Sequence, residues 1–503
     1  MPKIVFLATD VALWALFAGL AAYVWKVRRT PDLRATWRSV LRDAPAMGAL
    51  VPLTVFVSIA ALDSLHFRPL LPPAAGAAAD APLAYATRTY SVLDLLAKSQ
   101  LDSAEKTYSA PLSYRQFTKE SMELDGRAVR DFPRLVFGGA HLREPASDWL
   151  ADLAMRSLRG LAGGALAGAL AALALVALGA RVRRQPLAAH WRALWQRETD
   201  VPWRAVLTTL MAVALLAGWI ASLWSGYHPL GTDRTGNDVL YQALKSVRTA
   251  IVIGSVATLA TLPFAIVFGI LAGYFKGWVD DLIQYLYTVL SSIPGVLLIA
   301  ACVLIIQVMI DKHPELYETG VERADLRLLL LCVVLGVTGW ATLCRLLRAE
   351  TLKLSELEYV QAARAFGVSH GGIMRRHVFP NVMHIVLIVS VLDFSALVLY
   401  EAVLSYVGVG VDPSTASFGS MFNLARTEMS RDPVVWWNLL AAFVFMLALV
   451  LSANLFARAV REAFDPRARA FRPRLEKKPQ PSAAAGPGIS GVQPVPASSA
   501  DTA

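Results

Sequence analysis

"EYVQAARAFGVSHGGIMRRHVFPN", residues Glu358–Asn381, separates two strongly apolar stretches near the C-terminal end of the chain. Four apolar residues recur within it at positions i, i+3, i+4 and i+7: Tyr359, Ala362, Ala363 and Phe366. This spacing predicts a helix with a single apolar stripe, and the alanines at its middle would let another backbone come close. The periodicity therefore indicates that this polar interruption is a folded contact surface and not an irregular loop.

The ends of the predicted helix are marked by polar and glycine residues. Ser355 and Glu358 have the spacing of a capping box, which predicts a helix beginning just past Ser355. Gly367 stands where a glycine commonly follows a helix, and Ser369 is placed to cap a second helix that runs to a break at Pro380. We expect a helix, a bend and a helix.

Such a segment has two interpretations. Its apolar face, with Arg364, Arg375 and Arg376 around it, suits docking into a groove on another protein. An amphipathic helix resting on the membrane surface would show the same periodicity, so the pattern alone leaves both open.

The composition indicates a membrane protein. The chain has 503 residues, of which 56% are apolar, and its mean hydropathy is +0.49. The net charge of +10 is typical of basic cytoplasmic loops in a membrane protein and does not require nucleic-acid binding. The three cysteines, Cys302, Cys332 and Cys344, lie in or beside apolar runs and are expected to be inert.

Nine stretches are long and apolar enough to cross a bilayer as helices. They are residues 4–25, 45–62, 160–180, 204–224, 249–274, 294–311, 327–344, 383–402 and 436–457. The first lacks the cut site of a cleaved signal, so we interpret it as a retained membrane helix.

The distribution of arginine and lysine predicts the topology. Four segments are basic: 26–42, 181–197, 345–376 and 458–474. All four fall on one side if the spans alternate, and the positive-inside rule makes that side the cytoplasm. We expect the N-terminus outside, the C-terminus inside, and residues 63–156 outside. An acidic outer loop is expected around Glu315, Glu318, Glu322 and Asp325, and residues 466–503 should be disordered.

The opening segment resembles the EAA loop of the permease subunits of ATP-binding-cassette importers. In that pattern Glu-Ala-Ala is followed by a glycine and then by an apolar pair ending in proline. The matching residues here are Gln361, Ala362, Ala363, Gly367, Val378, Phe379 and Pro380, with Gln361 in place of the usual acid and His377 in place of an aliphatic residue. The resemblance implies that residues 355–381 contact an ATPase, and the expected contact residues are Glu358, Gln361, Ala362, Ala363, Arg364, Phe366, Gly367 and Pro380.

Three further stretches are similar to the dipeptide/oligopeptide/nickel branch of this family. They are "HPLGTDRTGNDVL" from His228, "GWVDDLIQYLYTVLSSIPGVLL" from Gly277, and "EAVLSYVGVGVDPSTASFGSMF" from Glu401. Asn237 replaces an arginine that the family usually has. The signature residues, whose roles the resemblance leaves open, are Gly231, Thr232, Asp233, Gly236, Asp238, Glu401, Ser405, Gly408 and Gly410.

The resemblance implies an all-α polytopic fold with the six-helix core of a type I importer permease over residues 204–465. Residues 1–62 would add two helices and a basic cytoplasmic loop, residues 63–156 an extracytoplasmic module, and residues 157–203 a third extra helix with a basic linker. The protein would be a multi-pass component of a bacterial inner membrane.

The implied function is that of a permease subunit for peptides or peptide-like solutes, and it is not enzymatic. The sequence contains no GxxxxGK[ST] phosphate loop, so ATP and Mg²⁺ are expected on partner ATPases. The implied partners are a second permease chain, two ATPase subunits or domains, a solute-binding protein and lipid. The alternative is a membrane-anchored sensor or assembly protein whose outer module binds a ligand and whose cytoplasmic helix recruits a partner.

Ionisable and histidine residues inside spans suggest further sites. Asp393 lies mid-span, where it suits either a transport pathway or an interhelical hydrogen bond. Asp10 is a weaker pathway candidate, since it lies outside the family core. His370, His377 and His384 recur every seventh residue, which places neighbours about 10 Å apart, too far to share one metal ion. No metal site is predicted, and turn formation is the better account of Asp233 and Asp238.

Overall fold

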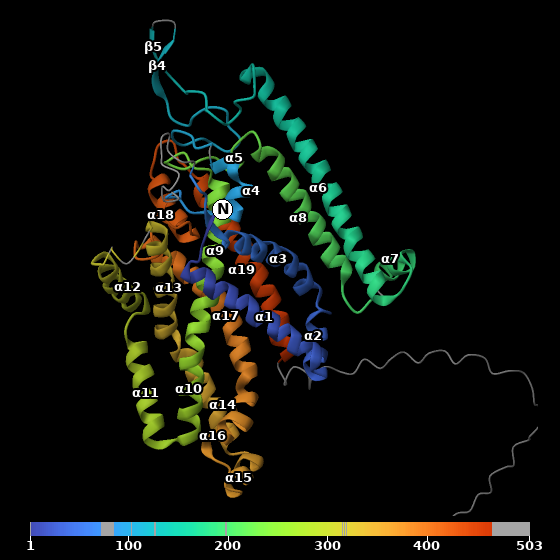
Figure 1. Ribbon diagram of the computed structural model, residues 1–503, viewed down its shortest axis with the longest axis vertical. Coiled ribbons are helices and arrows are strands. Elements are labelled where there is room, and N and C mark those ends of the chain that lie inside the picture. The colour runs from blue at the N-terminus through green and yellow to red at the C-terminus, as the bar shows by residue number, and fades with distance from the viewer. Residues whose placement is uncertain are drawn as a thin grey trace, which may run out of the picture. The chain divides into compact units, whose positions relative to one another are not determined.

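The computed structural model describes residues 2–71, 85–101, 103–124, 127–196, 199–313, 315, 317 and 319–464. The described part is mostly helical (Figure 1). Residues 466–503, for which the sequence predicts disorder, lie outside the described residues, as does Glu318.

Within the described residues, seven helical segments are long and apolar enough to span a membrane, and two bent helix pairs bring the number to nine. The seven are α1 (Ala8–Arg29), α3 (Ala44–Asp63), α6 (Pro145–Arg183), α8 (Trp203–Trp224), the run α9–η1–α10 (Val239–Val252, Ile253–Ala257, Thr258–Phe275), the run α16–η3–α17 (His370–Ile373, Met374–Val378, Phe379–Tyr406), and α19 (Trp437–Phe464). This number agrees with the nine spans that the sequence predicts.

The two bent pairs differ from the predicted spans. Helices α11 (Gly277–Ser292) and α12 (Gly295–Asp311) meet at 88°, and α13 (Gly320–Gly339) and α14 (Ala341–Ser355) meet at 41°. The predicted span 294–311 corresponds to α12, whereas a straight span over 327–344 is wrong, because the chain bends between Gly339 and Ala341. Ile293 is extended because the residue before a proline is disfavoured in the helical conformation, and Pro294 then starts a new helix in another direction.

Short elements connect the spans. The helices are α2 (Pro31–Val40), α4 (Val92–Leu96), α5 (Lys98–Leu101), α7 (Leu187–Trp195), α15 (Glu358–Ala365) and α18 (Phe418–Glu428). Strands β1 (Lys3–Val5), β2 (His66–Arg68) and β3 (Tyr90–Ser91) form an antiparallel sheet in that order, with Ile4 opposite Phe67. Strands β4 (Glu120–Leu124) and β5 (Arg127–Asp131) form a hairpin. The sheet joins the chain before α1 to the segment after α3.

The N-terminal helices pack against the predicted core. Leu13 of α1 and Phe56 and Ala60 of α3 are buried in one cluster with side chains of α9, α13, α17 and α19. Helix α6 instead packs along α8, and the two backbones are so close that a Cβ atom on Gly164 would lie 2.5 Å from the carbonyl oxygen of Ala214. Glycine is therefore required at this crossing.

Charged side chains from three regions meet in the interior. Asp10 of α1 accepts hydrogen bonds from Arg248 of α9, at 3.1 Å from its Nε, and from His66 of β2, at 2.7 Å. The Thr9 amide donates to Asp325 of α13 at 2.9 Å, and all five side chains are buried. Asp325 was expected in an exposed acidic loop, and this expectation is wrong, because α13 begins at Gly320 and places Asp325 within reach of Arg248.

A second ionic contact lies beside the first. Lys245 of α9 pairs with Asp94 of α4 at 2.9 Å and lies 3.6 Å from Asp63 at the end of α3. Tyr241 donates a hydrogen bond to Asp94 at 2.6 Å. Two cations of a predicted core helix are thus neutralised by carboxylates from outside that core, so the N-terminal region is an integral part of this fold.

Candidate coupling segment and transport pathway

The coupling segment, residues 355–381, begins differently from its prediction. Helix α14 continues through Ser355, whose hydroxyl donates to the Leu352 carbonyl at 2.7 Å. Helix α15 starts at Glu358 with Leu357 as its N-cap and without a side-chain cap. The predicted capping box is therefore wrong, because Ser355 is occupied in the last turn of the preceding helix.

The end of α15 agrees with the prediction. Gly367 has φ +75° and follows the C-cap residue Phe366. The Gly367 amide donates to the Arg364 carbonyl at 3.0 Å, and the Val368 amide donates to the Ala363 carbonyl at 3.1 Å. This pair of bonds is the Schellman motif, which requires a left-handed residue and thus favours glycine.

The second helix starts as predicted but ends elsewhere. The Ser369 hydroxyl accepts the Gly372 amide at 3.2 Å and caps α16. The helix then widens into the π-helical turn η3 and continues through Pro380 into α17, so the predicted break at Pro380 is wrong. Pro380 comes two residues after the π-helical turn, and such a local widening lets a membrane helix accommodate a proline. The coupling segment is consequently continuous with a membrane span.

Three of the four residues of the apolar stripe of α15 are exposed, whereas Ala363 is half-buried and packs against the protein. Phe366 is 87% exposed and Tyr359 42%, and Ala362 is also exposed. On the opposite side Val360 is fully buried and packs in one cluster with Ile373 and Val378. The helix is thus held by one face and presents the other at one end of the molecule, as Figure 1 shows for α15.

Polar contacts join the coupling segment to the end of α10. Lys276 forms an ion pair with Glu356, and this hydrogen bond lowers the pKa of the Glu356 carboxyl. Tyr274 and His370 are hydrogen-bonded at 2.9 Å, and the Arg364 guanidinium lies 5.3 Å from the centroid of the Tyr274 ring. A displacement of α15 would therefore be transmitted to two spans, α10 and α17.

The first signature stretch, residues 228–240, folds as a tight loop at the start of α9. Gly231 and Gly236 have φ of +71° and +78°. The Asp233 carboxylate accepts the amides of Thr235 and Asn237 at 2.8 and 2.9 Å, while Asp238 caps α9 through the Tyr241 amide at 2.9 Å. These contacts support turn formation as the role of both aspartates.

The described part of residues 85–144, which belongs to the predicted module 63–156, packs on this loop. Thr232 accepts the Ser109 amide at 2.7 Å and donates to the Thr107 carbonyl at 2.9 Å. A Cβ atom on Gly236 would lie 1.8 Å from the carbonyl oxygen of Glu105. The signature loop is therefore covered by a segment outside the predicted core.

His228 and Glu105 form the charged centre of this contact. His228 is buried and donates from Nδ1 to Asp238 at 2.7 Å, and its Nε2 lies 3.6 Å from Glu105. Glu105 also accepts the amides of residues 136–138 at 2.8 to 3.0 Å. Burial opposes charge on His228, but the hydrogen bond to Asp238 and the negative charges of Asp238 and Glu105 outweigh it and raise the pKa of His228 to about 9.

This contact is expected to weaken at alkaline pH. Because the pKa of His228 is raised in the folded state, its protonation stabilises the fold fully below pH 6.5, which is its ordinary pKa. This stabilisation is lost as the pH rises through about 9. The difference between the two pKa values corresponds to about 3 kcal/mol in the free energy of unfolding. Proteolytic cleavage within residues 85–144 should accelerate between pH 7 and pH 10, and His228→Gln should be cleaved fast at both. A pH-independent rate for the unaltered protein would contradict this role of His228.

The third of the family-like stretches, residues 401–422, turns the chain from α17 into α18. Glu401 is buried and accepts hydrogen bonds from Ser405 at 2.7 Å and from Ser417 at 3.0 Å. Gly408 has φ +89°, and a Cβ atom on Gly410 would overlap Ser405. These contacts satisfy Glu401 inside the turn and give it a structural role.

Asp393 lies near the middle of α17 and is half-buried. Among the described residues, none forms a hydrogen bond or an ion pair with its side-chain carboxylate. The interhelical hydrogen bond, which was one interpretation of the sequence, is therefore not formed within the described chain. An ionisable group without a partner at this depth is expensive in lipid, which favours a polar surrounding.

The predicted site residues thus fall into three separate groups. The coupling residues lie at one end of the spans, the signature residues at the other, and Asp393 between them. Sequence reasoning missed Arg248 and Lys245, the basic residues to which the N-terminal region binds, although their helical spacing of three in an apolar helix was a usable signal.

Comparison with known proteins agrees with this architecture. Residues 265–470 match the family described as "Binding-protein-dependent transport system inner membrane component". The oligopeptide transport system permease protein OppC of Mycobacterium tuberculosis is 31% identical over 245 residues, which are 49% of this chain and 78% of OppC.

Two other relatives are similar over comparable lengths. The glutathione transport system permease protein GsiD of Pectobacterium atrosepticum is 28% identical over 306 residues, 57% of this chain and 94% of GsiD. The dipeptide transport system permease protein DppC of Bacillus subtilis is 27% identical over 245 residues, 49% of this chain and 70% of DppC. The chain belongs to the family of binding-protein-dependent transport system inner membrane components, as a multi-pass permease subunit of an ATP-binding-cassette importer and not as an enzyme.

Proposed function

We propose that this chain forms half of the translocation pathway of an ATP-driven importer for peptides or peptide-like solutes, and that the coupling segment docks into an ATPase. The observation that carries the docking is the exposed stripe of α15, anchored through Val360 and continuous with α17. Driving a two-state equilibrium from 1:99 to 99:1 requires about 5.5 kcal/mol of differential binding, which only a rigid contact transmits. The contacts of α15 to α10 supply that rigidity.

The proposed orientation has the coupling segment in the cytoplasm and the N-terminus outside. Asp10 near the start of α1 contacts Arg248, whereas the coupling segment contacts Tyr274. Tyr274 follows Arg248 by 26 residues of the same helical run, about 39 Å at 1.5 Å per residue. The start of α1 and the coupling segment therefore belong to opposite membrane faces, and the basic end of α1 falls on the cytoplasmic side.

The proposed assembly contains a second permease chain, two ATPase subunits or domains that hold ATP and Mg²⁺, and an outer solute-binding protein. The family is binding-protein-dependent, which supports the outer partner. Asp393, half-buried and without a partner among the described residues, is proposed to line the pathway. The cargo class is supported by OppC, DppC and GsiD, whose names specify oligopeptide, dipeptide and glutathione transport.

The test is a reconstituted assay with the complete transporter in vesicles. We expect ATP hydrolysis and uptake to rise together when the solute-binding protein is added with a peptide, and to stay low when it is added empty. Absence of stimulation by any member of a mixed di- to pentapeptide library would contradict the proposed cargo class.

A further inference from the structure

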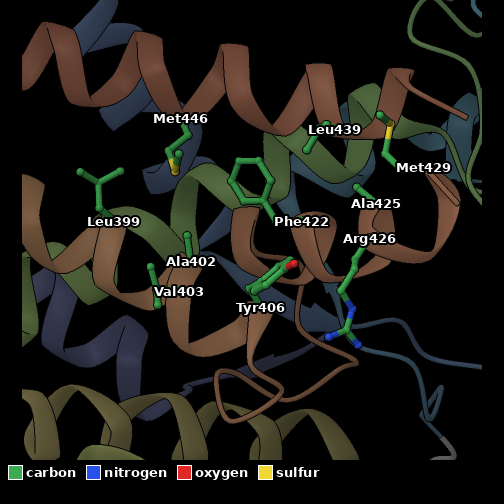
Figure 2. Close-up of a pocket in the computed structure, with 10 residues that line it drawn as sticks. All are labelled: Leu399, Ala402, Val403, Tyr406, Phe422, Ala425, Arg426, Met429, Leu439 and Met446. Atoms are coloured by element: carbon green, nitrogen blue, oxygen red, sulfur yellow. The ribbon is translucent and has the colours of Figure 1, made fainter. Parts of the chain in front are cut away.

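A cavity of about 470 Å³ lies between the end of α17, helix α18 and the first half of α19. Its wall is almost entirely apolar, with Leu399, Ala402, Phe422 and Met446 among the lining side chains. Arg426 of α18 lies at one side next to Tyr406, as Figure 2 shows, with Leu399 at the opposite side. The volume falls within the range of pockets for small solutes.

The charge of Arg426 is not compensated. Its guanidinium carbon lies 5.5 Å from the centroid of the Tyr406 ring, and no carboxylate of the described residues lies within ion-pair distance. Arg431, which also lies over a tyrosine ring, has no ion pair among the described residues either, so what distinguishes Arg426 is its place beside the cavity. Arg426 is thus available to an external anion.

An apolar wall and a single cation suit a particular kind of solute. Arginine binds a carboxylate through two parallel hydrogen bonds, and stacking on an aromatic ring holds the guanidinium plane in place. The apolar wall would take a hydrophobic side chain of the same solute. A phospholipid, with a phosphate and an acyl chain, shares this chemistry, so a test must separate the two sources.

We propose that this cavity is an outer subsite at which Arg426 binds the terminal carboxylate of an incoming peptide-like solute. The inference rests on the proposed function and adds a recognition residue to it. Asp393 lies nine residues before Ala402, which places it on the opposite face of α17, so it does not belong to this subsite.

The direct test measures contact between the solute and this cavity in the absence of the solute-binding protein, because that protein selects solutes before they reach the permease. The purified transporter is irradiated with a tripeptide that carries photoreactive leucine, either as the free acid or as the C-terminal amide. We expect crosslinks to peptides containing Leu399 or Met446, about tenfold more with the acid, as for a hydrogen bond to a charged group. Arg426→Gln should remove the preference, and Arg426→Lys should keep most of it.

Arg431→Gln is the matched control. Arg431 is also exposed and stacks on a tyrosine, 5.0 Å from the centroid of the Tyr108 ring, but it does not line the cavity. This variant should retain the acid preference. Equal crosslinking of acid and amide in the unaltered protein would overturn the proposal, and so would an acid preference that survives in Arg426→Gln.

Other occupants give distinct results. If phosphatidylglycerol vesicles abolish the crosslink while phosphatidylcholine vesicles do not, the cavity is a lipid site and the proposal fails. If Arg426→Gln releases the second permease chain, the cavity is a subunit interface and the proposal also fails. Uptake separates this inference from the function: normal peptide uptake by Arg426→Gln overturns the subsite alone, whereas absence of peptide uptake by the unaltered transporter overturns the proposed function.

Discussion

Replacing Gly367 by aspartate is expected to reduce peptide uptake by more than about tenfold while the protein remains in the membrane. The left-handed conformation of this residue costs a side chain roughly 1–2 kcal/mol, which is too little to unfold the segment. A Cβ atom there would meet no atom within 4 Å of its own chain. Any larger effect must therefore come from a partner molecule. Uptake and ATP hydrolysis should be measured in the same vesicles, where we expect hydrolysis to continue without uptake.

Gly277→Asp is the control for this variant. Gly277 also has a positive φ, +57°, and free space around its Cβ position, but it starts α11 outside the coupling segment. It should transport nearly as the unaltered protein does. If Gly367→Asp transports normally, or if both variants fail equally, the docking role of the α15–α16 bend is refuted.

Asp10→Ala is expected to destabilise the protein by about 3–5 kcal/mol, because removing one member of a buried ion pair leaves the other charge uncompensated. Arg248 and His66 both bond to this carboxylate, and all three side chains are buried. The loss should appear as a lower midpoint of thermal unfolding in detergent. It would also release α1 from α9, so the spans of the permease core should become more accessible to proteases.

Asp32→Ala serves as the comparison, since Asp32 is an exposed aspartate in the first turn of α2. Its replacement should change the free energy of unfolding by less than about 0.5 kcal/mol. Equal unfolding midpoints for Asp10→Ala and the unaltered protein would show that the N-terminal helices are an appendage and not part of the fold.

The sequence predicts the spans well because lipid requires long apolar helices, and that requirement leaves a clear pattern. It predicts the turn at Gly367 and the cap at Ser369 because both follow from local backbone chemistry. It fails at Ser355, which forms the last residue of α14 and does not cap α15, and at Pro380, where the helix continues from η3 into α17. The partner of Asp325 could not be predicted, because Arg248 is 77 residues earlier in the chain and nothing local indicates their contact.

The candidate sites divide in the same way. The sequence predicts the apolar stripe of α15 because helical periodicity alone places its residues on one face. The cavity beside Arg426 is assembled from α17, α18 and α19, and neither Leu399 nor Met446 carries a signal that would connect them. The sequence likewise does not predict that Glu105 covers Gly236, since Glu105 lies in a segment that lacks any recognisable motif.

We propose that the bend after α15 binds an ATPase in the cytoplasm. Phe366→Cys, at an 87% exposed position, tests it most directly, because Cys332 and Cys344 are fully buried and Cys302 is largely covered. A membrane-impermeant thiol reagent should label the new cysteine in inside-out vesicles stripped of ATPase, and adding the ATPase back should protect it. Labelling from the outer face, or labelling that the ATPase leaves unchanged, would contradict the account.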